Sequence, residues 1–109
     1  MLKKKYRLPA GAKLTHAASY KLPSLTLMIA KNDLTLSRFG FIASKKIDKR
    51  AVVRNRIKRV VRSCIEEMLG KIVEGYDMLF IISKNATLQK RDVLYSEIES
   101  VLKEKQLLK

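Results

Sequence analysis

The stretch from Ser44 to Arg62 reads SKKIDKRAVVRNRIKRVVR, and it joins a helical pattern to the densest charge of the chain. It contains nine of the 24 Lys and Arg residues and one acid, Asp48, so it carries eight of the fourteen net positive charges. Like charges at this density repel one another in a folded protein unless an anion offsets them. The charge therefore predicts a polyphosphate partner, either RNA or DNA.

Apolar residues recur at helical spacing from Val53 onward, three or four positions apart. We call them the apolar stripe. Its members are Val53, Ile57, Val60, Val61, Cys64, Ile65, Met68 and Leu69. A stripe of this kind predicts an amphipathic helix over residues 52–69 that packs on the rest of the protein, with Gly70 as its stop.

The other side of this helix is polar, and we call it the cationic face. Its members are Arg54, Asn55, Arg56, Lys58, Arg59 and Arg62. A solvated charged face is the ordinary alternative, but such faces usually alternate in sign. Here Arg54/Lys58 and Lys58/Arg62 are like-charge pairs four residues apart, which destabilise a helix. A bound nucleic acid explains the face better than solvation does.

The remaining pattern predicts five further segments. A short helix is expected within residues 12–20, and strands over 25–31 and 37–44, joined as an antiparallel hairpin by a turn at Asn32-Asp33. A buried strand follows at 76–82, and a final helix begins near Lys90 and ends near Leu107. The order α-β-β-α-β-α predicts a small α+β domain in which the helices pack on one sheet.

At 109 residues and with 47% hydrophobic content, the chain is expected to be a single domain, 1–109, with one modest core. Residues 1–10 read as a basic N-terminal arm that lacks the apolar region of a secretory signal. The single cysteine, Cys64, favours a reducing cytoplasm. No apolar run reaches the length of a membrane span, so we expect no membrane association.

Candidate catalytic residues are few. His16 is the only histidine and has no acid or cysteine near it in sequence, so we interpret it as a surface residue. Cys64 lies on the apolar stripe, where a buried thiol behaves as a small hydrophobic group. The aspartates show no metal-ligand spacing, and there is no phosphate-binding glycine loop. The sequence thus predicts no catalytic residues and no metal site on the chain itself.

The contiguous string RFGFIASKKIDKRAVVRNRIKRVVR, residues 38–62, resembles the signature of the bacterial ribonuclease P protein component. The resemblance extends to the basic start, the GYD strand entry and the C-terminal helix. It implies the ribosomal protein S5 domain 2-like type of sandwich, in which strand 38–44, helix 52–69 and strand 76–82 form a left-handed β-α-β crossover. That hand opposes the general rule for parallel strands.

The resemblance also implies an activity. The family's protein joins a large catalytic RNA in a 1:1 complex, and the complex removes the 5′ leader of precursor tRNA by phosphodiester hydrolysis. The RNA supplies the active site and binds the Mg2+, so the chain counts as a subunit of an RNA-dependent endoribonuclease. The alternative is a non-catalytic ribosomal or other structural RNA-binding protein. A DNA-binding module is less favoured because no helix-turn-helix is visible.

Carried onto this chain, the family's RNA contacts correspond to a turn and the cationic face that follows it. They are Ser44, Lys45, Lys46, Lys49, Arg50, Arg54, Asn55, Arg56, Lys58, Arg59 and Arg62. Family members also hold the single-stranded leader in a cleft with aromatic residues. The corresponding positions here are Leu14, Ala18 and Met28, with Phe39 and Phe41 as further candidates. Because Leu14, Ala18 and Met28 cannot stack on bases, we expect weak or altered leader recognition.

Overall fold

The computed structural model describes residues 2–9, 14 and 16–109. Four strands form one mixed sheet of order β1-β2-β4-β3. The strands are β1 (Ala18–Lys21), β2 (Leu25–Lys31), β3 (Arg38–Ile42) and β4 (Tyr76–Ile82), and the helices are α1 (Ala51–Met68) and α2 (Arg91–Glu104). Three short 3-10 helices add η1 (Lys4–Tyr6), η2 (Leu69–Lys71) and η3 (Lys84–Leu88).

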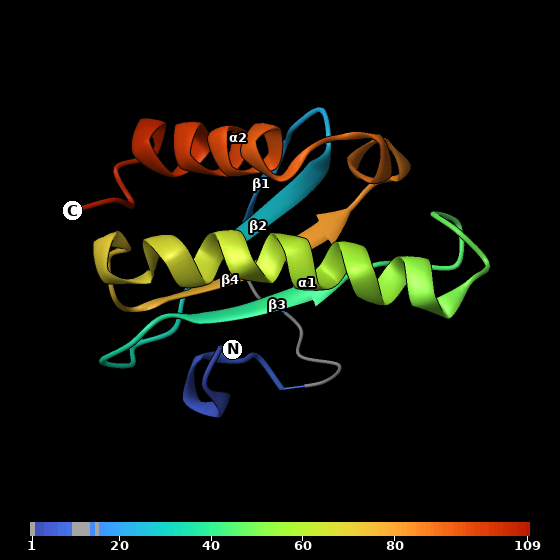
Figure 1. Ribbon diagram of the computed structural model, residues 1–109. Helices are drawn as coiled ribbons and strands as arrows, with labels where there is room; N and C mark the ends of the chain where they lie inside the picture. The colour runs from blue at the N-terminus through green and yellow to red at the C-terminus, as the bar shows by residue number, and fades with distance from the viewer. Residues whose placement is uncertain (1, 10–13, 15) are drawn as a thin grey trace.

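Both α-helices cover the same face of the sheet (Figure 1). The core lies between them and that face, which presents Leu27 of β2, Phe39 of β3 and Phe80 of β4, each no more than 1% exposed. From α1 the buried contributors are Ile57, Val61, Cys64, Ile65 and Met68. The prediction of an α+β domain with helices on one sheet is confirmed, and the apolar stripe up to Met68 lies on the side of α1 that faces the core. Gly70 does not stop the helix, because α1 ends at Met68 and Leu69–Lys71 continue as η2.

The crossover through α1 joins two parallel strands, β3 and β4. In Figure 1 both strands point to the right, α1 lies in front of the sheet, and β4 lies above β3. That arrangement is left-handed, as the resemblance implied and against the general preference. Residues 43–50 join the end of β3 to the start of α1 and form a short, mostly basic segment at one end of the helix.

The predicted hairpin between segments 25–31 and 37–44 is wrong. β2 pairs antiparallel with β4, from Leu25 opposite Ile82 to Lys31 opposite Tyr76, and β4 therefore separates β2 from β3. β4 is the most apolar strand, YDMLFII, and its side chains are buried or half-buried on both faces. A strand that is apolar on both faces is stabilised most at the centre of a sheet, where both faces are buried. The shorter β3 therefore lies at an edge.

The short helix predicted within residues 12–20 is also wrong where the structure describes the segment. Residues 18–21 form β1, which pairs with β2 from Ala18 opposite Ile29 to Lys21 opposite Thr26. The amide of Leu22 donates to the carbonyl of Leu25 at 2.8 Å and closes a tight turn around Pro23-Ser24. A two-turn helix is marginal in isolation, so pairing with a buried strand prevails. Residues 12, 13 and 15 lie outside the described part.

The basic N-terminal arm docks on the free edge of β3. The amide of Leu8 donates to the carbonyl of Phe39 at 2.9 Å, and Arg7 pairs with Phe39 as an isolated parallel bridge. The side chain of Leu8 approaches Gly40, where a Cβ would lie 3.1 Å from Leu8 and 3.0 Å from Leu79. Glycine in the RFGFI strand therefore lets the arm close over β3.

Candidate nucleic-acid interface

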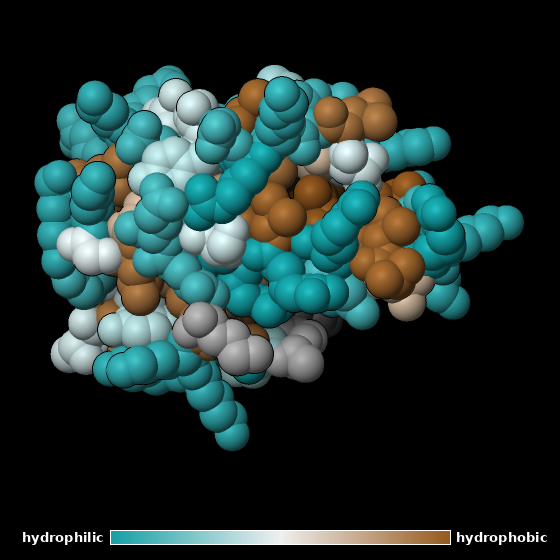
Figure 2. All heavy atoms as spheres, viewed as in Figure 1, coloured by the Kyte–Doolittle hydropathy of each residue, from teal (hydrophilic) through white to brown (hydrophobic). Residues whose placement is uncertain are grey.

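α1 separates its two faces as the periodicity predicts. Ile57 is 6% exposed and Val61 is fully buried, whereas Asn55, Arg56 and Arg59 are exposed to solvent. The remaining residues of the cationic face are half-buried: Arg54, Lys58 and Arg62. Figure 2, which views the molecule from the helix side, shows hydrophilic side chains over most of this surface. The charge is thus displayed on a helix that the core holds rigidly.

Residues 44–50, which we call the basic turn, present Ser44, Lys45, Lys46, Lys49 and Arg50 just before α1. Ile47 anchors the turn because its side chain is 6% exposed and belongs to the core. The amide of Ile47 donates to the carbonyl of Ser44 at 3.0 Å. All five presented residues are exposed to solvent, and all but Ser44 are Lys or Arg, so the turn continues the cationic face.

Asp48 lies inside this cationic surface and is engaged by Arg50. Its Oδ1 accepts from the Arg50 amide at 2.8 Å and from Nε at 3.1 Å, and its Oδ2 accepts from Nη2 at 3.0 Å. These hydrogen bonds from the Arg50 side chain and amide lower the pKa of Asp48 to about 2. Sequence reasoning counted Asp48 only as the one acid among nine cations and missed its pairing with Arg50.

Arg54 has an internal role as well as a place on the cationic face. Its Nη1 donates to the carbonyl of Asp48 at 2.9 Å and to the carbonyl of Lys49 at 2.8 Å. The side chain therefore reaches back from the first turn of α1 to the segment before it. Charge and periodicity could not reveal this contact, because it depends on how the basic turn folds.

Arg62 also combines a place on the cationic face with a contact inside the protein. Its guanidinium lies 5.6 Å from the centroid of the Phe41 ring, a cation–π arrangement. Phe41 in turn stacks on Phe80 with centroids 5.4 Å apart and an interplanar angle of 12°. Arg62 thus caps an aromatic pair at the β3 edge while the other side of its side chain faces solvent.

The five candidate residues for the leader cleft do not gather in one place. Phe39, Phe41 and Ala18 lie in register with Met78, Phe80 and Ile29, which puts all three on the helix-covered side of the sheet. Met28 has the opposite orientation, in register with Leu79 and Ser19. Leu14 is half-buried and precedes β1. We call the side of the sheet that bears Met28 the helix-free face.

The helix-free face carries no aromatic side chain from the strands. The strand aromatics are Tyr20, Phe39, Phe41, Tyr76 and Phe80, and the strand register places every one of them on the helix-covered side. The helix-free face instead presents half-buried Met28, Leu79 and Ile81 together with Ile42, which is 44% exposed. It offers apolar contact without a stacking platform.

The basic arm adds charge that the sequence pattern did not connect with α1. Lys3, Lys4 and Lys5 are exposed, and Lys3 and Tyr6 share a small surface pocket with Glu66 and Leu69 near the C-terminal end of α1. The cationic surface therefore has two parts, one at each end of the helix. These parts are about forty residues or more apart in the chain. The burial of Leu2 in the core and the docking of Leu8 on β3 bring them to one helix.

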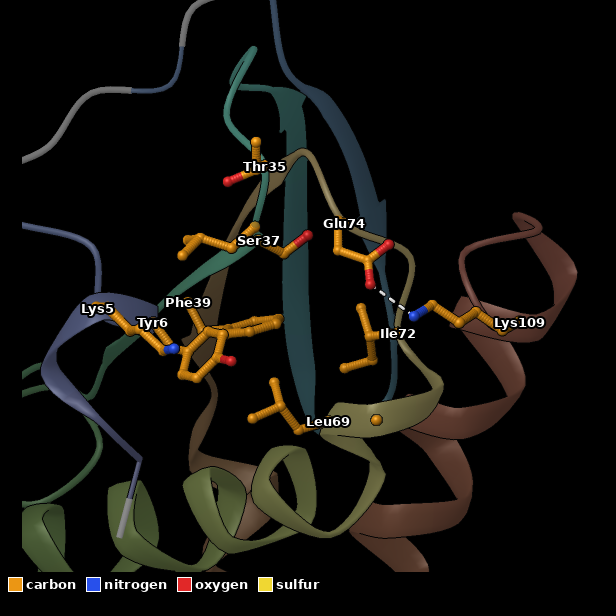
Figure 3. Close-up of a pocket in the computed structure, with 11 residues that line it drawn as sticks. Lys5, Tyr6, Thr35, Ser37, Phe39, Leu69, Ile72, Glu74 and Lys109 are labelled. Atoms are coloured by element: carbon orange, nitrogen blue, oxygen red, sulfur yellow. Dashed lines mark hydrogen bonds and ion pairs between the residues drawn. The ribbon is translucent and has the colours of Figure 1, made fainter.

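A larger pocket of about 440 Å³ lies at the end of α1 away from the basic turn (Figure 3). Phe39, Leu69 and Ile72 form its apolar wall, and Lys109 forms an ion pair with Glu74 at its rim. The hydroxyl of Ser37, which also lines it, donates to the carbonyl of Val73 at 2.7 Å and accepts from the Tyr76 amide at 3.1 Å. The hydroxyl proton is therefore held by a backbone carbonyl and not by a general base that could activate the oxygen as a nucleophile.

The residues present do not suit a metal ion on the protein. Among the residues that the structure describes, no three His, Cys, Asp or Glu side chains come together as a possible cation site. Cys64 is fully buried, and burial raises the pKa of its thiol, which keeps it protonated and unreactive. Across the described ranges, no helix is long and apolar enough to cross a membrane.

Comparison with known proteins identifies the family. The family model described as Ribonuclease P matches residues 3–106, which include the basic turn, both α-helices and all four strands of the sheet. The chain belongs to the ribonuclease P protein family. The resemblance read from residues 38–62 is therefore confirmed, and it extends over almost the whole chain.

Curated relatives carry the same family name. The ribonuclease P protein component of Fusobacterium nucleatum is 46% identical over 72 residues, which cover 66% of this chain and 64% of that relative. The component from Clostridium botulinum (strain Loch Maree / Type A3) is 39% identical over 85 residues, covering 77% of this chain and 72% of the relative. The chain thus spans slightly less than two thirds of the Fusobacterium relative.

Solved structures of the family share the fold. A Staphylococcus aureus RNase P protein mutant with defective mRNA degradation activity aligns with a TM-score of 0.84 at 25% identity, covering 95% of this chain and 91% of that one. The RNase P protein from Thermotoga maritima aligns with a TM-score of 0.74 at 24% identity, covering 82% of this chain and 84% of that one. At that identity the second likeness concerns the fold alone.

Proposed function

We propose that this protein is the protein subunit of ribonuclease P and binds the catalytic RNA through the basic turn and the cationic face of α1. The observation that carries the proposal is the division of α1. Ile57 and Val61 are buried while Arg56 and Arg59 remain exposed, on a chain whose residues 3–106 match the family. Exposed Arg and Lys side chains on a rigid helix suit phosphate binding, since Arg forks grip two oxygens at once.

The role of the chain in this proposal is binding rather than chemistry. Phosphodiester hydrolysis and the Mg2+ it uses are assigned to the RNA, as the family resemblance implies. This assignment is consistent with the described residues, among which no three His, Cys, Asp or Glu side chains gather as a possible metal site. The protein contributes positive charge close to the RNA backbone. That charge substitutes for part of the counterion atmosphere, so the complex is expected to need less free Mg2+ than the RNA alone.

Precursor tRNA is the proposed substrate of the complex, and its 5′ leader is the part that the protein is expected to contact. The helix-free face offers Met28, Leu79 and Ile81 for apolar contact, with the exposed cation Lys21 beside them. Without aromatic stacking, which contributes about 1–3 kcal/mol per base, the grip on the leader is proposed to be weak. We further propose a monomer in a 1:1 complex with the RNA, in the cytoplasm.

Reconstitution separates this function from a non-catalytic ribosomal or structural role. Purified protein is added to a bacterial ribonuclease P RNA at a Mg2+ concentration at which the RNA alone cleaves precursor tRNA slowly. Stimulated release of the 5′ leader at the correct site supports the proposal. Tight RNA binding without stimulation, against a positive control with the Clostridium botulinum protein, would leave the structural RNA-binding role.

A further inference from the structure

Asp48 is an acid in the middle of the surface assigned to RNA, and elementary electrostatics makes it unfavourable there. A carboxylate within a Debye length of a phosphate, about 8–10 Å at ordinary ionic strength, repels it. The stretch from Ser44 to Arg62 contains nine cations and this single acid. An acid at this position is therefore expected to stabilise the protein in some other way, and the contacts of Asp48 show two such contributions.

The first contribution of Asp48 is to the start of α1. The helix begins at Ala51, its N-cap residue Arg50 makes no side-chain capping hydrogen bond, and its first turn holds no acid. The Arg50 amide is satisfied by Oδ1 of Asp48 at 2.8 Å instead. A carboxylate at this position also faces the positive end of the helix dipole, which is favourable.

The second contribution is to the shape of the basic turn. The carboxylate of Asp48 holds the Arg50 side chain through Nε and Nη2, at 3.1 and 3.0 Å. The carbonyls of Asp48 and Lys49 accept from Nη1 of Arg54 at 2.9 and 2.8 Å. The carboxylate thus holds Asp48 and Arg50 together within the turn, and the two carbonyls join the turn to Arg54 of α1. The buried side chain of Ile47 anchors the turn in the core.

We propose that Asp48, with Arg54, is a positioning residue that pre-organises the basic turn, so that removing its negative charge weakens RNA binding. This role rests on the proposed function, because it concerns how that RNA surface is held. The side chains of Lys45, Lys46 and Lys49 are exposed to solvent. They meet the RNA with a smaller loss of entropy when the backbone beneath them is already fixed.

Pre-organisation and simple electrostatics predict opposite signs, which makes a direct test possible. Binding of the full-length protein to a bacterial ribonuclease P RNA is measured at several salt concentrations for the wild type, Asp48→Ala and Asp48→Asn. Asp33→Asn is the matched control, because Asp33 is exposed in the β2–β3 loop and its backbone (φ 58°) is one that Asn tolerates well. Circular dichroism establishes the folded fraction of each variant before binding is compared.

Asp48→Ala removes all three hydrogen bonds between the carboxylate and Arg50 and is expected to bind about three- to tenfold more weakly, which corresponds to a net loss of about one hydrogen bond in free energy. Asp48→Asn keeps the acceptor for the Arg50 amide and is expected to recover part of the affinity, and Asp33→Asn is expected to bind as the wild type or slightly tighter. Equal or tighter binding by Asp48→Ala would overturn the inference. Failure of the wild type to bind would overturn the proposed function instead.

Two further readouts distinguish positioning from a loss of overall stability. Hydrogen exchange at the Arg50 amide is expected to accelerate in free Asp48→Ala, while exchange in the core strand β4 stays unchanged. In a double-mutant cycle, Asp48→Ala and Arg54→Ala are expected to be non-additive in RNA affinity, because both release the same turn. Additive effects, or unchanged exchange at Arg50, would contradict a shared positioning role.

Discussion

Arg56 and Ile57 are adjacent in sequence and about 100° apart around α1, and one is exposed to solvent while the other is 6% exposed in the core. This relationship separates the stability of the domain from its binding of RNA. Ile57→Ala removes buried methyl groups and is expected to lower the free energy of unfolding by about 2–5 kcal/mol. Arg56→Ala is expected to change it by less than about 0.5 kcal/mol. Urea unfolding of both variants checks the assignment, which would be wrong if the two variants were destabilised equally.

Asp77 and Arg38 form a bidentate ion pair at one end of the sheet, with Nε to Oδ1 at 2.9 Å and Nη2 to Oδ2 at 2.8 Å. Asn32 adds a hydrogen bond to Oδ1 at 2.9 Å. Asp77→Asn is expected to cost about 1–3 kcal/mol of stability at pH 7, because it leaves part of the Arg38 guanidinium unsatisfied. Urea unfolding at pH 7 measures that cost.

The same pair predicts a pH dependence of stability. Burial alone would raise the pKa of Asp77, but the hydrogen bonds from Arg38 and Asn32 and the charge of Arg38 outweigh it and hold the pKa below the ordinary 3.8. A depressed folded-state pKa contributes stability that is present above the unfolded value and is lost as the pH falls through the folded value. The difference between the wild type and Asp77→Asn is therefore expected to shrink below pH 3.8. A difference that stayed constant down to about pH 2 would contradict the sign.

Arg62 and Arg59 belong to the same cationic face but differ in what they touch. Arg62 lies over the Phe41 ring, whereas Arg59 is exposed. Arg62→Ala is expected to lower the free energy of unfolding by about 0.5–1 kcal/mol, because it removes the cation–π interaction. Arg59→Ala is expected to leave it within about 0.5 kcal/mol of the wild type. Equal thermal stabilities of the two variants would show that Arg62 contributes no packing.

The absence of strand aromatics on the helix-free face predicts weak dependence on leader length. Precursor tRNAs with leaders of one or two nucleotides and of several nucleotides are expected to bind the reconstituted complex with affinities within about threefold of each other, since a stacked base would contribute about 1–3 kcal/mol. Equilibrium binding in Ca2+, which slows cleavage, provides the measurement. A large fall in affinity on shortening the leader would contradict the prediction.

Periodicity and composition predicted the elements that have strong patterns. The bounds expected for the strands at 25–31 and 76–82 agree with β2 and β4, and the apolar stripe identified the buried side of α1. The pairing of strands was not predictable in this way. The two antiparallel pairs are β2 with β4 and β1 with β2. Which strands pair depends on which strand is stabilised most by burial at the centre, and that depends on the whole sheet.

The sequence predicted which charged residues form the candidate site, but it did not predict the hydrogen bonds among them. The order of residues in SKKIDKRAVVRNRIKR identified the family and the cationic face. The roles of Asp48 and Arg54 came only from the structure, because a carboxylate-to-amide contact and a guanidinium-to-carbonyl contact depend on backbone direction in the basic turn. The face to which Phe39 and Phe41 point required the sheet register.

The central claim is that the exposed cations of α1 bind the RNA of ribonuclease P. The most direct measurement is the salt dependence of RNA affinity for a variant with Arg56→Gln and Arg59→Gln, compared with a control carrying Lys84→Gln and Lys103→Gln. The control removes the same charge from exposed positions on η3 and α2. The log–log slope is expected to become shallower by about 0.7–0.9 for each phosphate that the first variant no longer neutralises, and to stay near the wild-type value in the control. Equal slopes for the two variants would contradict the claim.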